Sequence, residues 1–134
     1  MRGTVLFLNS RESTSPFADH FRTDGLFVHA AERAEDAVQQ IDDIAPDVVV
    51  AILGQDNGPS VVRELRSSVD DATSIIVIAD LNDLEEAQHA GADSFLLKSA
   101  LPSEVLYEVR RALILRRSGR RLAWNPRAVS RGAR

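Results

Sequence analysis

Short apolar runs alternate with amphipathic stretches along most of the chain. Runs rich in aliphatic and β-branched residues predict five strands, at residues 4–8, 26–30, 48–53, 75–78 and 94–97. Apolar residues at helical spacing predict five helices, at about residues 16–22, 34–44, from 60 onward, 83–89 and 102–117. Each predicted strand is therefore followed by a predicted helix.

Proline, glycine and serine mark several of the expected boundaries. Pro16 suits the first turn of the first helix, and Ser60 is placed to cap the third. The second helix is expected to stop before Pro46, because the residue that precedes a proline is pushed out of the α region. Gly91 is the usual type of residue at a helix C-terminus and closes the fourth helix.

The regular alternation predicts a (βα)₅ domain with an open parallel sheet. The runs at 48–53 and 75–78 are apolar without alternation, which is typical of central strands covered by helices on both faces. Residues 118–134 have no periodic apolar face, and we interpret them as a basic tail or linker. Leu122, Ala123 and Trp124 are the residues of this segment that could dock on the domain.

The formal net charge of −4 hides a division of the chain. Residues 1–109 hold seven basic residues and all 20 acids, a net charge of −13, whereas residues 110–134 hold nine arginines and no acid. A basic segment of this kind attracts nucleic acid, an anionic membrane surface or an acidic protein surface. We therefore expect an acidic body with a basic C-terminal part.

Composition excludes several classes of protein. The 134 residues suffice for one domain with its own core, and the lack of cysteine excludes thiolate nucleophiles and cysteine-ligated metals. The three histidines show no ligand spacing, and no apolar run is long enough to span a bilayer or to serve as a signal peptide. We expect a cytoplasmic protein without a metal or cofactor.

Functional groups of an open parallel sheet gather beyond the carboxyl ends of its strands. The sequence places Asn9 and Ser10 after the first strand, Ile52 at the end of the third, Ala79 at the end of the fourth and Lys98 after the fifth.

The chain resembles the receiver domain of two-component response regulators over about residues 3–117. The resemblance is carried by Val5-Leu-Phe-Leu8, Ala45-Pro-Asp-Val-Val-Val50, the Asn57-Gly58 turn before a helix that ends in Leu65-Arg66, Ile75-Ile-Val-Ile78 and, above all, Ala90-Gly-Ala-Asp-Ser-Phe-Leu-Leu-Lys98. It implies a doubly wound α/β fold with strand order 2-1-3-4-5, a receiver-like domain at 1–117 followed by the tail, and a role in signal transduction without enzymatic activity.

The sequence departs from this family where its phosphorylation chemistry lies. Receivers use an acidic pair after strand one, an aspartate after strand three and a hydroxyl after strand four to bind Mg²⁺ and a phosphoryl group. Those positions hold Asn9-Ser10, Ile52 and Ala79, and only Lys98 is retained. The usual proline after the lysine is Ser99, so we expect a trans bond there.

The remaining polar residues near the strand ends have two possible interpretations. Glu12, Asp56 and Asp80 could form a substitute rim with Lys98 for a small ligand or metal, or they are solvated loop carboxylates. Lys98 is expected to pair with Asp80 or with a loop carbonyl.

The last predicted helix offers a candidate interface. In receivers the face made by helix four, strand five and helix five is the usual dimer or partner surface, and here it would present six residues: Phe95, Tyr107, Arg110, Arg111, Ile114 and Leu115. Alternatively, the tail folds over the apolar side chains, with Leu122 or Trp124 as the plug. No helix-turn-helix or aromatic platform accompanies the arginines, so nonspecific contact with phosphates is the form that nucleic-acid binding would take.

We therefore predict a receiver-like module that is not phosphorylated and acts through contacts with a signalling protein or with a second copy. The alternatives are a crevice that binds a small ligand or metal, and a nucleic-acid-binding regulator that uses the arginine-rich tail.

Overall fold

A computed structural model of the chain describes residues 2–8, 15–54 and 57–124. In chain order the elements are β1 (Thr4–Leu8), α1 (Ser15–Thr23), β2 (Phe27–Ala31), α2 (Ala34–Ile44), β3 (Val48–Ile52), α3 (Ser60–Ser68), β4 (Ser74–Ala79), the 3₁₀ turn η1 (Leu81–Asp83), α4 (Leu84–Ala90), β5 (Ser94–Leu97) and α5 (Pro102–Arg116). The predicted alternation of strands and helices is confirmed, and each predicted boundary agrees or moves by one residue.

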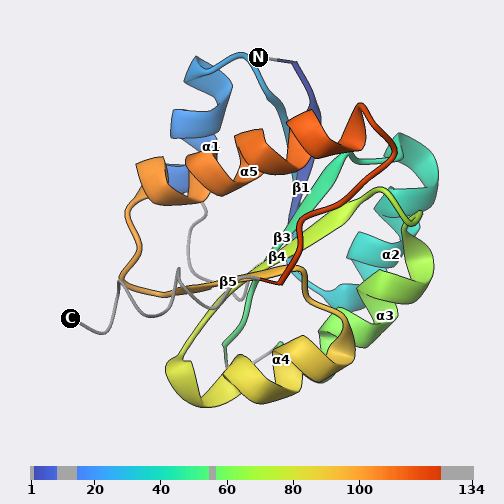
Figure 1. The fold of residues 1–134 in the computed structure, drawn as a ribbon, viewed down its shortest axis with the longest axis vertical. Helices are drawn as coiled ribbons and strands as arrows, with labels where there is room; N and C mark the ends of the chain where they lie inside the picture. The colour runs from blue at the N-terminus through green and yellow to red at the C-terminus, as the bar shows by residue number, and fades with distance from the viewer. Residues whose placement is uncertain (1, 9–14, 55–56, 125–134) are drawn as a thin grey trace.

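One parallel sheet with the strand order β2-β1-β3-β4-β5 forms the middle layer (Figure 1). Helices α1 and α5 cover one face, and α2, α3 and α4 cover the other. Because β3 and β4 lie between two helical layers, their apolar side chains are buried on both faces, as the continuous runs in the sequence predict. This confirms the doubly wound α/β fold.

Two helix ends show where local signals decide the boundary. Ser60 is the first residue of α3 instead of its cap, since Pro59 occupies the cap position and makes no side-chain hydrogen bond there. Gly91 has φ +113° after α4, in the left-handed region that favours glycine, as its predicted role requires.

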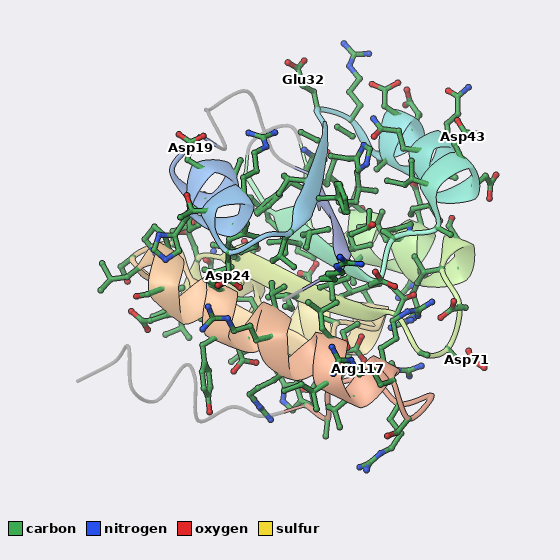
Figure 2. All side chains as sticks on the ribbon, turned by 90° about the horizontal axis from the view of Figure 1, so that it is seen from above. Asp19, Asp24, Glu32, Asp43, Asp71 and Arg117 are labelled. Carbon is green, nitrogen blue, oxygen red and sulfur yellow. The ribbon has the colours of Figure 1, made fainter. Side chains whose placement is uncertain are left out.

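The end of α5 is fixed to the amino-terminal ends of the strands. The Arg116 guanidinium contacts the Asp47 carboxylate at 2.8 Å and the Asp70 carboxylate at 2.9 Å, and Asp47 also accepts a hydrogen bond from the Thr4 amide. Asp24, just after α1 and labelled in Figure 2, pairs with Arg110 of α5. These pairs tie α5 to parts of the chain far away in sequence.

The segment after α5, residues 118–124, which we call the strap, folds back onto the sheet (Figure 1). Gly119 adopts φ +70°, and the Arg120 amide donates to the Leu115 carbonyl, which reverses the chain. The Leu122 amide then donates to the Ser74 hydroxyl at 2.9 Å, and the Leu122 side chain is only 3% exposed within the cluster that α5 covers.

Trp124 packs against the cluster on the opposite face of the sheet. The strap therefore docks through Leu122 and Trp124, but it does not cover the apolar side chains of α5 as the alternative expected, because Tyr107 and Ile114 stay more than half exposed.

The Asp93 carboxylate binds two arginines, one from α3 and one from the strap. It contacts Arg66 of α3 at 2.7 Å and Arg121 of the strap at 2.8 Å, and it also accepts the Ile75 amide. Burial raises the pKa of Asp93 above its ordinary value, against the opposing effects of the Ile75 amide and the two guanidinium groups. One buried carboxylate thus connects α3, β4 and the strap.

Candidate functional site

The carboxyl ends of the central strands carry apolar side chains where the sequence placed a degenerate pocket. In the sheet, Ile52 lies opposite Ile78, and Ala79 lies opposite Leu97, so both residues stand at this edge. Ile52 is half-buried and packs against the α1 and α5 side, and Ala79 is fully buried. Neither side chain can accept a phosphoryl group or donate a hydrogen bond to one.

Lys98 follows β5 at the same edge and pairs with Asp80, which follows β4. The ammonium lies 3.8 Å from the carboxylate, and both side chains are largely exposed. The predicted pairing is therefore present, and an exposed pair of this length contributes little to stability. The structure has no cis peptide bond among the described residues, so the expected trans bond between Lys98 and Ser99 is also found.

Four of the predicted site residues, Asn9, Ser10, Glu12 and Asp56, lie outside the described residues. Within the part of the chain that the structure describes, no group of three or more histidine or carboxylate side chains could hold a metal ion. In the same residues no helix is long and apolar enough to cross a membrane.

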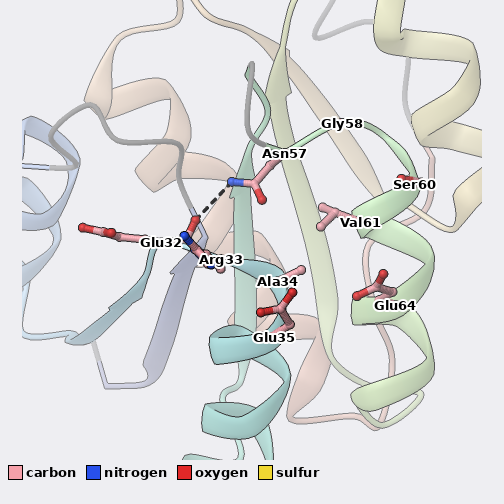
Figure 3. A pocket seen from close by; sticks show the side chains of 9 residues that line it. All are labelled: Glu32, Arg33, Ala34, Glu35, Asn57, Gly58, Ser60, Val61 and Glu64. Carbon is pink, nitrogen blue, oxygen red and sulfur yellow. Dashed lines mark hydrogen bonds between the residues drawn. The ribbon is translucent and has the colours of Figure 1, made fainter.

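Next to this edge, a cavity of about 490 Å³ opens between the amino-terminal ends of α2 and α3 (Figure 3). Its lining consists of Glu32, Arg33, Ala34, Glu35, Asn57, Gly58, Ser60, Val61 and Glu64. Three carboxylates against one guanidinium make the lining acidic. The cavity lies on the β2 side of the predicted pocket. None of the described residues of that pocket lines the cavity.

Asn57 connects the two loops that frame the cavity. Its side chain is 4% exposed, and its amide nitrogen donates to the Glu32 carbonyl at 3.3 Å. Its backbone carbonyl accepts the Gly54 amide at 2.9 Å, which closes the turn after β3. The side-chain oxygen points into the cavity (Figure 3). Sequence reasoning identified Asn57 as part of a turn but not as a wall of a cavity.

The candidate interface on α5 is only partly exposed. Tyr107 and Ile114 are 57% and 54% exposed, whereas Leu115 is half-buried against the core. Phe95 is 1% exposed, so its assignment to an interface is wrong: its side chain points to the α2–α4 side of the sheet and belongs to the core there. A strand places alternate side chains on opposite faces, and the sequence of a short strand does not show which face stays open.

Most of the described arginines after residue 109 contact acids of the same chain. Arg110 pairs with Asp24, and Arg111 pairs with Glu108, which is itself buried and accepts the Ser94 hydroxyl. Arg116 and Arg121 hold the contacts described above. These four arginines are therefore engaged by acids of the domain itself, which disfavours a free phosphate-binding surface on α5.

Solved structures with the same architecture are numerous. A CheY-like response regulator receiver domain protein from Methanospirillum hungatei superposes with a TM-score of 0.77 at 15% identity, over 89% of this chain and 99% of that one. The fold is that of a receiver domain.

Two further structures agree with this. A LuxR-family two-component response regulator from Aurantimonas matches with a TM-score of 0.70 at 24% identity, over 97% of this chain and 94% of that one. A two-component response regulator from Clostridium difficile matches with a TM-score of 0.72 at 15% identity, over 83% and 95% of the two chains. No protein-family model matches the sequence, and no curated protein does.

Proposed function

We propose that this chain is a regulatory module of a signal-transduction pathway that has the receiver fold, is not phosphorylated and acts through protein contacts. The observation that carries the proposal is the chemistry at the carboxyl edge of the sheet. Ile52 and Ala79 stand at the ends of β3 and β4, where receivers have the phosphoacceptor and the hydroxyl, and neither side chain has a polar atom. Lys98 has Asp80 as its partner.

The proposed contact surface is the outer side of α5. Tyr107 and Ile114 are seven residues apart, so they lie on the same side of the helix, and both are more than half exposed. Arg110 lies between them and is held by Asp24. Exposed aromatic and aliphatic side chains next to arginine are enriched at protein interfaces. The proposed partner is a signalling protein or a second copy of the chain, in the cytoplasm.

The experiment is incubation of the full chain with acetyl phosphate, and separately with beryllofluoride, in the presence of Mg²⁺. We expect no gain in mass and no change in the amide NMR spectrum around β3, β4 and β5. A receiver domain that has the aspartate serves as the positive control. A phosphoryl adduct, or spectral changes that saturate with beryllofluoride, would refute the proposal.

A second candidate function is binding of a small ligand. It is favoured by the cavity next to α2 and α3, whose wall includes the buried polar side chain of Asn57 and three glutamates. A ligand at 100 times its Kd stabilises a protein by ~2.7 kcal/mol. A thermal-shift panel of amines, nucleotides and divalent ions would therefore reveal it.

A further inference from the structure

The two edge strands of the sheet, β5 and β2, differ in how many of their side chains are buried. At one edge, three of the four side chains of β5 are buried. At the other edge, three of the five side chains of β2 are exposed, and Phe27 is 67% exposed. An open edge presents unpaired backbone groups that can pair with another strand.

The hydrogen bonds of β2 show which backbone groups face outward. The Phe27 amide donates to the Gly3 carbonyl at 2.9 Å, so Phe27 and every second residue after it bond to β1. Val28 and Ala30 therefore direct their amides and carbonyls away from the sheet. The Ala30 carbonyl accepts the Gln40 side chain at 3.1 Å, and the other three groups have no partner among the described residues.

A groove of about 290 Å³ runs beside this edge on the α2 side. Its lining consists of Ala30, Ala31, Glu32, Asp36, Gln39, Gln40 and Asp43. In the described part of the chain none of its three carboxylates takes part in an ion pair, whereas the acids near α5 and the strap are paired with arginines. Figure 2 shows Glu32 and Asp43 on the outer side of the molecule, away from Arg117.

We propose that β2 and this acidic groove form a docking surface for an extended peptide segment that carries arginine or lysine. The segment adds to the sheet as a sixth strand and bonds to the outward groups of Val28 and Ala30. Ala31 packs with α2, so Phe27, His29 and Ala31 lie on the α2 face of the strand. Every second side chain of the added strand lies on this face as well, and there its cation meets the carboxylates of the groove.

This surface is separate from the one proposed on α5. The docking segment is recognised by two independent features, which are the backbone groups of an edge strand and an unneutralised negative groove. The first requires an extended backbone, and the second requires positive side chains. The proposal therefore makes separate predictions for the backbone and for the charges.

The probe is a blocked heptapeptide, Thr-Arg-Val-Arg-Val-Arg-Thr, in which arginines alternate with β-branched residues. The control is the same peptide with glutamine in place of each arginine. Binding of each peptide to the full chain is measured by calorimetry at low and at physiological salt. We expect the arginine peptide to bind more tightly than the glutamine peptide, by a margin that shrinks as salt increases.

Hydrogen exchange tests the backbone part. The Val28 and Ala30 amides face outward and should exchange quickly in the free protein, whereas the His29 amide bonds to β1 and should already be protected. The arginine peptide should slow exchange at Val28 and Ala30 specifically. The variant Ala30→Pro removes one outward amide without removing a ladder bond, and it should weaken the peptide at least several-fold.

The charge part is tested with Glu32→Gln/Asp36→Asn/Asp43→Asn. We expect about 10-fold weaker binding of the arginine peptide, since each partly exposed carboxylate adds a modest attraction. Asp42→Asn is the matched control, because Asp42 is an exposed acid on α2 that does not line the groove. Circular dichroism melts show whether each variant is folded.

Three results would overturn the proposal: no binding of the arginine peptide, binding that is unchanged in the triple variant, or binding without protection of Val28 and Ala30. Dimers of the free chain whose contacts protect those amides would also overturn it, because the edge would then be taken by a second copy. The double variant Tyr107→Ala/Ile114→Ala should leave peptide binding unchanged, which separates this inference from the proposed function of α5.

Discussion

Replacing Leu122 by alanine should destabilise the domain although the residue follows the last helix. The leucine side chain is 3% exposed and packs in the cluster that α5 covers, and its amide holds the Ser74 hydroxyl. Leucine-to-alanine changes at buried sites cost about 2–5 kcal/mol, through lost burial and the cavity that remains. The strap has no regular secondary structure and can relax into part of the cavity. The lower part of that range, about 2–3 kcal/mol, is therefore the expected loss.

Urea unfolding followed by circular dichroism measures this loss. The midpoint should fall while the slope of the transition stays the same, because the variant unfolds the same surface. In thermal melts the same loss corresponds to roughly 5–10 °C for a domain of this size. Ile114→Ala is the matched control, since it removes an aliphatic side chain that is 54% exposed on the neighbouring helix. Its effect should stay below about 1 kcal/mol.

Equal midpoints for Leu122→Ala and the unaltered chain would refute the reasoning. The strap would then lie on the domain without contributing to its stability, and the folding unit would end at about residue 117, as the sequence analysis expects. A loss of the expected size instead extends the cooperative unit to the strap.

Two further predictions concern the ion pair between Arg116 and Asp70 and the glycine that ends α4. Arg116 holds the pKa of Asp70 well below its ordinary value of 3.8, so the carboxylate stabilises the fold above about pH 4, and this contribution is lost as the pH falls toward the lowered pKa. Asp70→Asn should therefore lower the Tm at pH 7 and have a much smaller effect at about pH 2; an equal effect at both pH values would contradict this origin. Gly91→Ala should destabilise by at least ~1 kcal/mol, because φ is +113° and the new Cβ would lie 2.9 Å from Cγ of Arg66, which holds Asp93. Gly58→Ala is its control, since a Cβ there meets nothing within 4 Å, and similar urea midpoints for the two variants would argue against the strain at Gly91.

The elements of the fold were predictable because their signals are local. The helix at 34–44 and the strand at 94–97 have the predicted bounds, since amphipathic spacing, Pro46 and Gly91 define them within a few residues. The β2 strand begins one residue later than predicted, at Phe27 instead of Leu26. Leu26 is buried and Phe27 is exposed, and composition alone does not distinguish two adjacent apolar residues at the start of an edge strand.

Contacts between distant parts of the chain were not predictable. Leu122, Ala123 and Trp124 form a short apolar run that the sequence marks as able to dock, but it has no period that shows where Leu122 packs. Asp47, in the loop before β3, bonds to Thr4 and to Arg116. Buried Glu108 accepts a hydrogen bond from the Ser94 hydroxyl of β5. Each of these interactions joins groups whose proximity exists only after the sheet has formed.

The positions of three strand-end residues were predictable, whereas the cavity beside them was not. Ile52, Ala79 and Lys98 stand at the edge of the sheet where the strand pattern put them. The neighbouring cavity depends on Glu32 and Asn57, which are 25 residues apart and meet through a backbone carbonyl. Every residue has a backbone carbonyl, so the sequence does not indicate which residue accepts the hydrogen bond from the Asn57 side chain.

The acidic groove beside β2 also bears on how copies of this domain treat one another. An uncovered edge strand ordinarily invites like edges to pair and is a starting point for aggregation. Two copies that met along β2 would bring their rows of carboxylates, Glu32, Asp36 and Asp43, close together. Repulsion between these like charges opposes that encounter at neutral pH, whereas a positively charged strand meets no such barrier. The negative charge beside β2 thus disfavours pairing between two copies of the domain and favours pairing with a positively charged strand.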